Sequence, residues 1–411
     1  MSKEQEEKKN NIVESKEREE EQEEECLPLL VHCDPEHVDD AVLAEPARML
    51  AEGKLVAFPT ETVYGLGANA TMADSVAAIF EVKGRPQDNP LIVHIGDAWQ
   101  LEQLTPVPIA EAAQRLAAAF WPGPLTLVLP RRAGAVPDCV TASLPTVAVR
   151  MPSHAVARRL LQLARVPVAA PSGNLSGRPS PTTAAHVVHD LGRSARVAAI
   201  IDGGACGFGV ESTVVDVRCA ACGGGPIVLR PGGVTLEQLR AVLPDIRVYS
   251  AAVFGTAMQQ RPSTPGMKYR HYAPAAPVTC WEKAPAAAPP HCVSAALVAR
   301  AHADVAASVR AHGYTHVGIV ATHAGPDSWR WDALAAQLPH VRVDVVPIGD
   351  ERTDLAAVEH GLFDALRTLD ARHVDAIFLE GVAEVQQGLA IMNRAKKAAS
   401  THIDVTSLLL P

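Results

Sequence analysis

Short apolar runs alternate with stretches of helical spacing along residues 54–245. Apolar runs between Pro and Gly residues predict buried strands, and apolar residues three or four positions apart predict helices. The predicted strands are 54–59, 90–95, 124–130, 145–152, 167–172, 197–202, 212–217 and 226–232. The predicted helices are 73–84 with a stop at Gly84, 107–120, 153–165 with Ser153 as its cap, one between 172 and 197, and a short one from Thr235.

Several connections between these strands are too brief for a helical crossover, which favours a twisted mixed sheet with helices on its outer side. A second α/β pattern follows. Buried strands ending in Gly are predicted at 316–325, 341–349 and 373–381, with helices around 293–312 and 353–371. This alternation predicts a smaller, parallel, Rossmann-like sheet. The Ala/Pro-rich stretch 282–292 is predicted to be a loop.

The pattern divides the chain into four segments: a tail (1–35), a first α/β domain (36–245), a linker (246–276) and a second α/β domain (277–411). The tail is acidic, with 11 Glu against four Lys and one Arg in residues 1–25, and is predicted to be disordered. It accounts for most of the net charge of −9, so the near-neutral remainder argues against a large nucleic-acid surface.

Targeting and metal signals are weak in this sequence. The tail resembles neither a secretory signal nor a mitochondrial presequence, and no run of 18 apolar residues is present, so a cytoplasmic protein without a membrane span is expected. The eight cysteines are expected to be reduced thiols. Cys219 and Cys222 form half of a zinc motif without a second half, which favours incidental thiols and no metal site.

Four cations stand next to predicted strands: Lys83, Arg85, Arg150 and Arg230. Ligands of open α/β sheets collect at strand ends, where such cations would neutralise a polyphosphate. The alternative is four surface cations with solvated heads, which is usual for Lys and Arg. Neither a P-loop nor a complete G-x-G-x-x-G motif occurs, so the kinase and dehydrogenase interpretations lack a motif.

Polar loops supply further candidates. The stretch 59–67 carries Thr60, Glu61, Thr62 and Tyr64, and 171–177 carries Ser172 and Asn174. Taken alone, each loop is better explained as an ordinary capped turn, and His94 fits a half-buried, satisfied histidine equally well. No side chain has the context of an activated nucleophile. The pattern therefore favours catalysis by positioning and charge stabilisation.

Nine segments, in this order, resemble one family: PTETVYGLG, KGRPQDNPLIVHI, FWPGPLTLVL, VAVRMPSH, APSGNLSG, GVESTVVD, VLRPGG, STPGMKYRHYAP and QGLAIMNRAKKAA. The family is that of the threonylcarbamoyl-AMP synthases, and the last two segments resemble its long, two-domain form. The resemblance covers roughly residues 36–411 and implies a YrdC-type catalytic domain with an open concave cleft. The CAACGGG insertion at 219–225 lies outside it.

The resemblance implies a reaction. L-threonine, bicarbonate or carbon dioxide, and ATP would give threonylcarbamoyl-AMP and pyrophosphate, with Mg²⁺ on the phosphates. A partner transferase would then modify an adenosine next to the tRNA anticodon, so contact with tRNA is at most indirect. The linker resembles a lid over the cleft, in which Lys268, Arg270 and His271 would meet phosphates and Tyr272 would lie near the nucleotide.

Residue roles follow from the same motifs. The resemblance implies a nucleotide-site tetrad, which is Lys83, Arg85, Ser172 and Asn174. Further ATP contacts implied by it are Asn89, Thr146, Ser180, Arg230 and Tyr272. Implied threonine contacts are Thr62, His94, Arg150, Ser212 and, through its backbone, Ala170.

Three other interpretations remain open. An RNA-binding module would show salt-sensitive RNA affinity without ATP consumption. A hydrogenase-maturation carbamoyltransferase would add an acylphosphatase region and paired zinc-finger cysteines, neither of which is visible. A scaffold of a tRNA-modifying complex would tolerate Lys83→Ala and Arg85→Ala.

Overall fold

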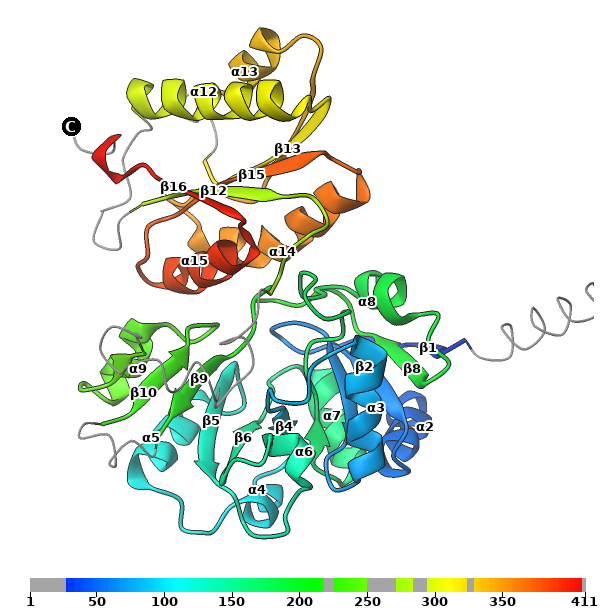
Figure 1. Cartoon of the computed structure of the whole chain (residues 1–411). Helices are drawn as coiled ribbons and strands as arrows, with labels where there is room; N and C mark the ends of the chain where they lie inside the picture. The colour runs from blue at the N-terminus through cyan, green and yellow to red at the C-terminus, as the bar shows by residue number, and fades with distance from the viewer. Residues whose placement is uncertain (1–26, 218–224, 250–270, 284–293, 324–328, 409–411) are drawn as a thin grey trace, which may run out of the picture.

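The computed structural model describes residues 27–217, 225–249, 271–283, 294–323 and 329–408. They form two α/β bodies, which follow one another along the molecule (Figure 1). Most of the tail, most of the linker, Cys219, Cys222 and most of the Ala/Pro-rich loop lie outside the described residues. Within the described part of the chain, no helix has the length and apolar character needed to cross a membrane.

The first body is built on one 11-stranded sheet, whose order is β1-β8-β2-β3-β7-β4-β6-β5-β9-β10-β11. Its strands are β1 (Leu29–His32), β2 (Leu55–Phe58), β3 (Gly65–Asn69), β4 (Ile92–His94), β5 (Leu125–Pro130), β6 (Thr146–Arg150), β7 (Val168–Ala169), β8 (Val197–Asp202), β9 (Thr213–Asp216), β10 (Ile227–Arg230) and β11 (Arg247–Val248). Parallel pairs such as β4–β6 alternate with antiparallel pairs such as β5–β6. The prediction of a mixed sheet is confirmed.

Helices accompany this sheet: α2 (Asp40–Ala51), α3 (Ala73–Lys83), α4 (Trp99–Leu104), α5 (Glu111–Phe120), α6 (Asp138–Thr141), α7 (Ala155–Ala164), α8 (Ala184–Leu191) and α9 (Leu236–Val242). Two predicted helix ends are confirmed. α3 stops where Gly84 adopts a left-handed φ of 59°, and α9 begins with a capping box between Thr235 and Gln238.

Three local predictions are wrong. Ser153 does not cap α7, because His154 is the N-cap and its backbone N–H approaches Glu61 Oε2 at 3.4 Å. α5 begins at Glu111 rather than 107, since Pro106 and Pro108 keep the preceding residues extended. Part of the predicted 1–35 tail is a strand: β1 pairs in parallel with β8 at the sheet edge, where its exposed side chains give no core pattern.

The second body is a five-stranded sheet of order β14-β13-β15-β12-β16, and all its pairs are parallel. The strands are β12 (Val278–Glu282), β13 (His316–Ala321), β14 (Arg342–Pro347), β15 (Ala376–Glu380) and β16 (Thr401–Asp404). The helices are α12 (Ala295–His312), α13 (Trp331–Gln337), α14 (Leu355–Ala371), α15 (Gln387–Ala398) and the 3-10 turn η2 (Thr406–Leu408). The Rossmann-like prediction is confirmed, except that β14 is a partly exposed edge strand rather than a buried one.

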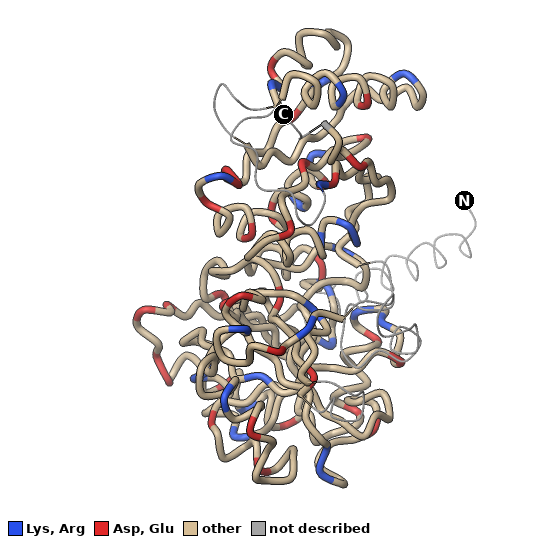
Figure 2. The backbone as a smooth tube through the Cα atoms, turned by 90° about the vertical axis from the view of Figure 1, so that its left-hand side faces the viewer, with Lys and Arg blue, Asp and Glu red and all other residues tan. Residues whose placement is uncertain are grey.

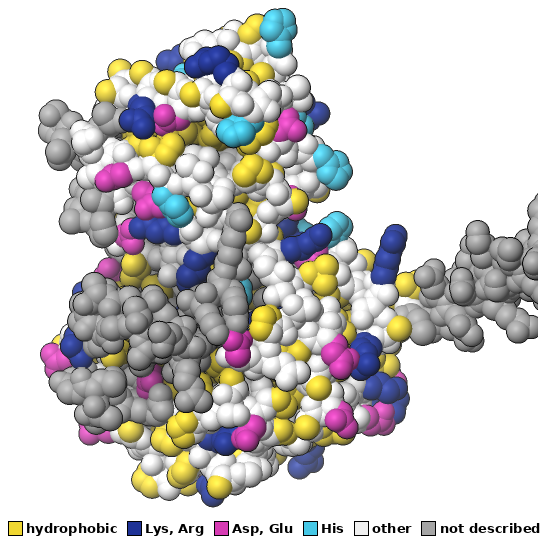
Figure 3. Space-filling model, viewed as in Figure 1, with side chains coloured by type: hydrophobic (Ala, Val, Ile, Leu, Met, Phe, Trp, Pro, Cys, Tyr) yellow, Lys and Arg dark blue, Asp and Glu magenta, His cyan; other side chains and the backbone are white. Residues whose placement is uncertain are grey.

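Helices α14 and α15 cover the face of the second sheet that is turned toward the first body, and α12 and α13 cover the other face (Figure 1). The side chains of α14 and α15 share an apolar cluster with Val63 and Tyr272. Arg367 of α14 donates to Asp190 Oδ2 at 2.7 Å across the junction. Basic side chains and histidines reach the surface where the bodies meet (Figure 3), whereas charges of both signs are interspersed along the whole backbone (Figure 2).

Candidate active site

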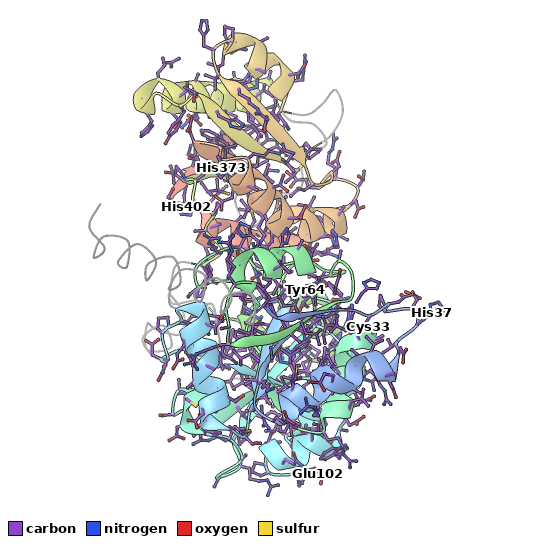
Figure 4. All side chains as sticks on the ribbon, turned by 90° about the vertical axis from the view of Figure 1, so that its right-hand side faces the viewer. Cys33, His37, Tyr64, Glu102, His373 and His402 are labelled. Atoms are coloured by element: carbon purple, nitrogen blue, oxygen red, sulfur yellow. The ribbon has the colours of Figure 1, made fainter. Side chains whose placement is uncertain are left out.

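An open cavity, with about 570 Å³ of space when the solvent at its mouth is included, lies in the first body beside the junction. The polar and charged side chains in its wall are Thr60, Thr62, Tyr64, Arg85, His94, Arg150, Ser172, Glu211, Ser212, Arg230, His271 and Tyr272. Tyr64 lies on the side of the first body that is turned toward the second (Figure 4), and its hydroxyl donates to Gly204 O at 2.7 Å. Residues from seven separated motifs therefore share one wall.

Arg150 organises one end of the cavity. It ends β6, directly opposite His94 of β4 in the parallel register. Its Nη1 donates to Thr62 Oγ1 at 2.9 Å, and its Nη2 lies 2.7 Å from Glu61 Oε1. Burial raises the pKa of Glu61, but Arg150 outweighs it and holds the carboxyl ionised. Its Nε also donates to Gly123 O at 3.4 Å, so two of the five guanidinium N–H groups remain for a ligand carboxylate.

His94 is a neutral histidine in this environment. Its side chain is 4 % exposed, so it is more deeply buried than the half-buried histidine considered above. Burial and then the charge of Arg150 lower its pKa to about 3. Its Nδ1 has no hydrogen-bond partner in the structure. A buried ring nitrogen without a partner can therefore bond to a ligand in the cavity.

Arg230 and Ser212 form the opposite wall. Arg230 ends β10 and donates to Ser212 O at 3.0 Å and to Ser212 Oγ at 3.2 Å. Ser212 Oγ also bonds to Thr126 Oγ1 at 2.8 Å. A β-bulge between Val228 and Arg230 shifts the antiparallel register of β9 and β10, so the guanidinium reaches back over the start of β9.

Lys83 and Arg85 follow the end of α3. Lys83 Nζ donates to the carbonyl oxygens of Ser172 and Asn174, so it clamps that loop and is not part of the cavity wall. Burial, together with the charge of Arg85, lowers the pKa of Lys83 well below its usual value. Arg85 lines the cavity, burial lowers its pKa to about 10, and its Nε has no hydrogen-bond partner. The hydrogen bonds of both side chains go to backbone carbonyl oxygens: those of Lys83 to Ser172 and Asn174, and those of Arg85 to Asn89 and Pro90.

Four other predicted residues lie outside the cavity wall. Asn174 donates to Leu175 O and Arg178 O, and both Asn174 and Asn89 keep a buried Oδ1 without a partner. Thr146 begins β6, roughly 13 Å along the strand from Arg150. Ser180 donates to Glu211 Oε1 at 2.7 Å. Of the predicted set, Thr62, Arg85, His94, Arg150, Ala170, Ser172, Ser212, Arg230 and Tyr272 line the cavity, and Lys83, Asn89, Thr146, Asn174 and Ser180 do not.

The described end of the linker also belongs to the wall. Tyr272 has a φ of 66°, is 5 % exposed and packs on Phe363 of α14 with ring centroids 5.1 Å apart. Burial raises its pKa to about 12. Burial and then Arg85 lower the pKa of His271 to about 4. The predicted phosphate contacts of Lys268 and Arg270 lie outside the described residues.

The sequence interpretation missed two site residues. Glu211 lines the cavity, and Arg394 of α15, which is fully buried, donates from Nε to Glu211 Oε2 at 3.0 Å. Burial raises the pKa of Glu211, but Arg394 and Arg230 lower it to about 2. Both residues stand in motifs quoted above, yet their separation of 183 positions gives no signal that they meet.

Glu61 was seen in its loop but was not assigned to the site. Glu61 stands in a stretch whose other residues are apolar or carry hydroxyl groups, so burial of its carboxylate requires a buried cation. That requirement was the sequence signal by which Glu61 could have been assigned to the site. Around the cavity the cations Lys83, Arg85, Arg150, Arg230 and Arg394 exceed the carboxylates Glu61 and Glu211. The excess suits a polyanionic ligand.

Comparison with known proteins agrees with this geometry. Residues 48–232 match the Sua5, YciO and YrdC family model, described as "Telomere recombination". Residues 234–400 match a model described as "Threonylcarbamoyl-AMP synthase, C-terminal domain". The threonylcarbamoyl-AMP synthase of Bacillus subtilis is 44% identical over 370 residues, which cover 90% of this chain and 96% of that protein.

Two further relatives agree. The threonylcarbamoyl-AMP synthase of Schizosaccharomyces pombe is 38% identical over 84% of this chain and 85% of its own length. The crystal structure of Pyrococcus abyssi Sua5 complexed with L-threonine superposes with a TM-score of 0.77 and 42% identity, covering 92% of this chain and 99% of that one. The chain therefore belongs to the threonylcarbamoyl-AMP synthase family, in its long two-domain form, and is an enzyme of that family.

Proposed function

We propose that this chain condenses L-threonine, bicarbonate or carbon dioxide, and ATP into threonylcarbamoyl-AMP and pyrophosphate. The observation that carries the proposal is the cavity itself. A polar end around Thr62, His94 and Arg150 adjoins a wall that carries Arg85 and Arg230, and around this cavity the cations outnumber the carboxylates. The complex of the P. abyssi relative with L-threonine supports an amino-acid ligand of the same kind.

The polar end suits threonine. The two remaining N–H groups of Arg150 would meet the carboxylate in a planar, directional arrangement. Neutral His94 and the hydroxyl of Thr62 or Ser212 would bond to the substrate's own hydroxyl. A site that hydrogen-bonds this hydroxyl rejects valine, because valine leaves buried polar groups unpaired.

The cationic wall suits the chemical step. The threonine amine adds to carbon dioxide and loses a proton, which gives a carbamate. A carbamate oxygen then attacks the α-phosphorus of ATP, and the bond to the bridging oxygen of the leaving pyrophosphate breaks. Negative charge grows on the phosphoryl oxygens and on pyrophosphate, and Lys83, Arg85 and Arg230 would stabilise it.

Mg²⁺ is proposed to arrive on the phosphates. Among the described residues, no group of three His, Cys, Asp or Glu side chains is placed to hold a metal ion. Glu211 carries the one carboxylate in the described wall, and its two oxygens already accept from Ser180 and Arg394. Phosphate and water oxygens would therefore hold the ion, which would supply further neutralisation of phosphate charge.

The product is a mixed anhydride that hydrolyses readily, so it must be passed on quickly. We propose that a partner transferase consumes it and places the threonylcarbamoyl group on tRNA. The interspersed charges of both bodies (Figure 2) support an indirect rather than a direct contact with tRNA.

The test is release of pyrophosphate from ATP by the purified chain, with L-threonine and bicarbonate omitted in turn. Release that requires both supports the synthase. Release that ignores threonine would contradict it and indicate another acyl acceptor. Absence of release, combined with salt-sensitive RNA affinity, would favour the RNA-binding interpretation.

A further inference from the structure

Glu211 joins three separate parts of the chain at the edge of the cavity. Its Oε1 accepts from Ser180 Oγ at 2.7 Å, and its Oε2 accepts from Arg394 Nε at 3.0 Å. Tyr272 lies beside the same carboxylate, whose charge adds to burial in raising the pKa of the phenol. Ser180 belongs to the loop before α8, Tyr272 to the end of the linker, and Arg394 to the second domain. One carboxylate thus fixes two groups that the family motif assigns to the nucleotide.

A buried carboxylate is an unfavourable group in a site for a polyanion, unless a cation compensates it. Arg394 supplies that compensation from the second domain. It is fully buried, it also donates to Pro231 O, and its guanidinium lies 6.0 Å from the centroid of the Tyr272 ring. Arg394 therefore holds both Glu211 and the aromatic end of the linker, while touching no residue assigned to threonine.

We propose that Arg394 is a positioning residue for the nucleotide half of the site. It holds the Glu211 carboxylate in the wall, so that Glu211 in turn fixes Ser180 and Tyr272, and it couples docking of the second domain to ATP binding. This inference rests on the proposed function. The threonine half is built by Thr62, His94, Arg150 and Ser212 of the first domain, and Arg394 donates to none of these side chains.

The first experiment is steady-state kinetics of Arg394→Gln. Loss of one partner of a buried charge pair leaves the other uncompensated, so KM for ATP should rise on the order of tenfold. KM for L-threonine should stay within about twofold of the wild-type value. Equal changes in both KM values, or none in KM for ATP, would overturn the proposal.

The second readout is the pH profile of KM for ATP between pH 8 and 5.5. The charged and titratable groups that face Glu211 are Arg394, Arg230, Lys397, His271 and Tyr272. In the wild type Glu211 stays ionised over this range, and Lys397, whose pKa burial lowers to about 7, gains a proton on acidification and favours a polyanion. The wild-type KM should therefore stay level or fall.

In Arg394→Gln, KM for ATP should rise as the pH falls, which is the opposite of the wild-type behaviour. Burial still raises the pKa of Glu211, and the principal opposing charge is gone. The carboxyl then takes up a proton as the pH falls, loses an acceptor for Ser180 or Tyr272, and KM for ATP rises. A level or falling profile in the variant would contradict the mechanism.

Arg367→Gln is the matched control. Arg367 is a nearly buried arginine of α14 that also crosses the domain junction, to Asp190 and Pro179 O. If Arg394 only stabilised docking, both variants would change the two KM values and the pH profile alike. The proposal requires a selective effect on ATP in Arg394→Gln alone.

Glu211→Gln keeps the test decisive if Arg394→Gln fails to fold. Glu211→Gln should raise KM for ATP, but this KM should not rise further as the pH falls, because glutamine does not titrate. Arg394→Lys should retain part of the ATP affinity that Arg394→Gln loses. A wild-type chain that releases no pyrophosphate would refute the proposed function. If the wild-type chain releases pyrophosphate but Glu211→Gln and Arg394→Gln leave KM for ATP unchanged, this inference alone would be refuted.

Discussion

At the scale of single residues, the site combines the buried ion pairs Glu61–Arg150 and Glu211–Arg394 with cations that donate to neutral acceptors. Lys83 is the extreme case, because two backbone carbonyls and no carboxylate receive its ammonium group. Burial penalises the charged form of such a group, and an incoming phosphate would relieve that penalty. The lowered pKa values of Lys83 and Arg85 therefore indicate a site in which a bound anion would stabilise the charged forms of both side chains.

Lys83→Ala should lower kcat/KM for ATP by roughly 100-fold or more, because the clamp on the loop of Ser172 and Asn174 and a positive charge beside the cavity are lost together. The wild-type affinity for ATP should also fall as the pH rises through the lowered pKa of Lys83, since only the charged form attracts phosphate. Pyrophosphate release across pH 6–9 measures both effects. The nearby, half-exposed Arg196, which pairs with Glu81, provides a control in Arg196→Ala. Comparable activity in the wild type and Lys83→Ala would disprove the role.

His94 should remain neutral throughout the physiological range. Its pKa of about 3 results from burial and from Arg150, so its ring should not titrate between pH 5 and 8. Histidine ring resonances in NMR, assigned through His94→Asn, measure this directly. A titration near the ordinary histidine pKa of about 6.5 would show that solvent reaches the ring and that the proposed hydroxyl contact is wrong.

At the scale of elements, strand ends and close backbone approaches decide where the side chains meet. β4 and β6 end side by side and bring His94 next to Arg150. The stretch after β8 carries Gly209, which has a φ of 76° and lies against the backbone of α14. A Cβ at this position would stand 2.6 Å from His360 Cα. Only glycine combines this conformation with this proximity.

Gly209→Ala should push α14 away from the first domain and destabilise the folded chain by about 2–4 kcal/mol. Activity should fall with it, because α14 supports Tyr272 in the cavity wall. Chemical denaturation and pyrophosphate release give the two measurements. Gly207→Ala is the matched control, since a Cβ there would meet nothing closer than Glu61 O at 3.9 Å. Equal stability of the two variants would refute this account of the junction.

At the scale of the whole molecule, two sheets of different construction close on one site. The mixed sheet supplies the threonine end and most cations. The parallel sheet contributes through its helices α14 and α15, which hold Tyr272 and Glu211. Histidines lie along the same junction. His186 Nε2 is 3.4 Å from Asp364 Oδ1 of α14, and burial and then Arg367 lower its pKa to about 4.

Acid should therefore loosen the junction. The folded pKa of His186 lies below the unfolded value of about 6.5, so the unfolded state binds more protons between roughly pH 6.5 and 4. Stability is retained above this window and is lost as the pH falls through it. Melting temperatures at pH 7.5 and 5 measure the loss, which His186→Gln should reduce. A variant with the wild-type pH slope would show that His186 does not contribute.

Much of this protein could be read from its sequence, because local physics sets local structure. Apolar periodicity located most strands and helices, Gly84 and Thr235 marked helix ends, and short connections implied a mixed sheet. The motif positions identified nine residues of the cavity wall, although no pattern other than family resemblance gave them roles. The edge strand β1 was missed, because a strand that buries little apolar surface carries little pattern. The strand β14 was predicted, but as a buried strand, whereas it is partly exposed.

The tertiary structure alone decided which distant charges neutralise one another. Glu61 meets Arg150, and Glu211 meets Arg394, over separations that no local spacing encodes. It also placed Lys83 on the carbonyls of Ser172 and Asn174 rather than in the open cavity. The sequence by itself determined the elements and the kinds of side chain, since propensity and burial act over a few residues. The Glu61–Arg150 pair depends on how distant segments of the first domain come together, and the Glu211–Arg394 pair depends on how the two domains dock, so both are settled only when the chain is folded.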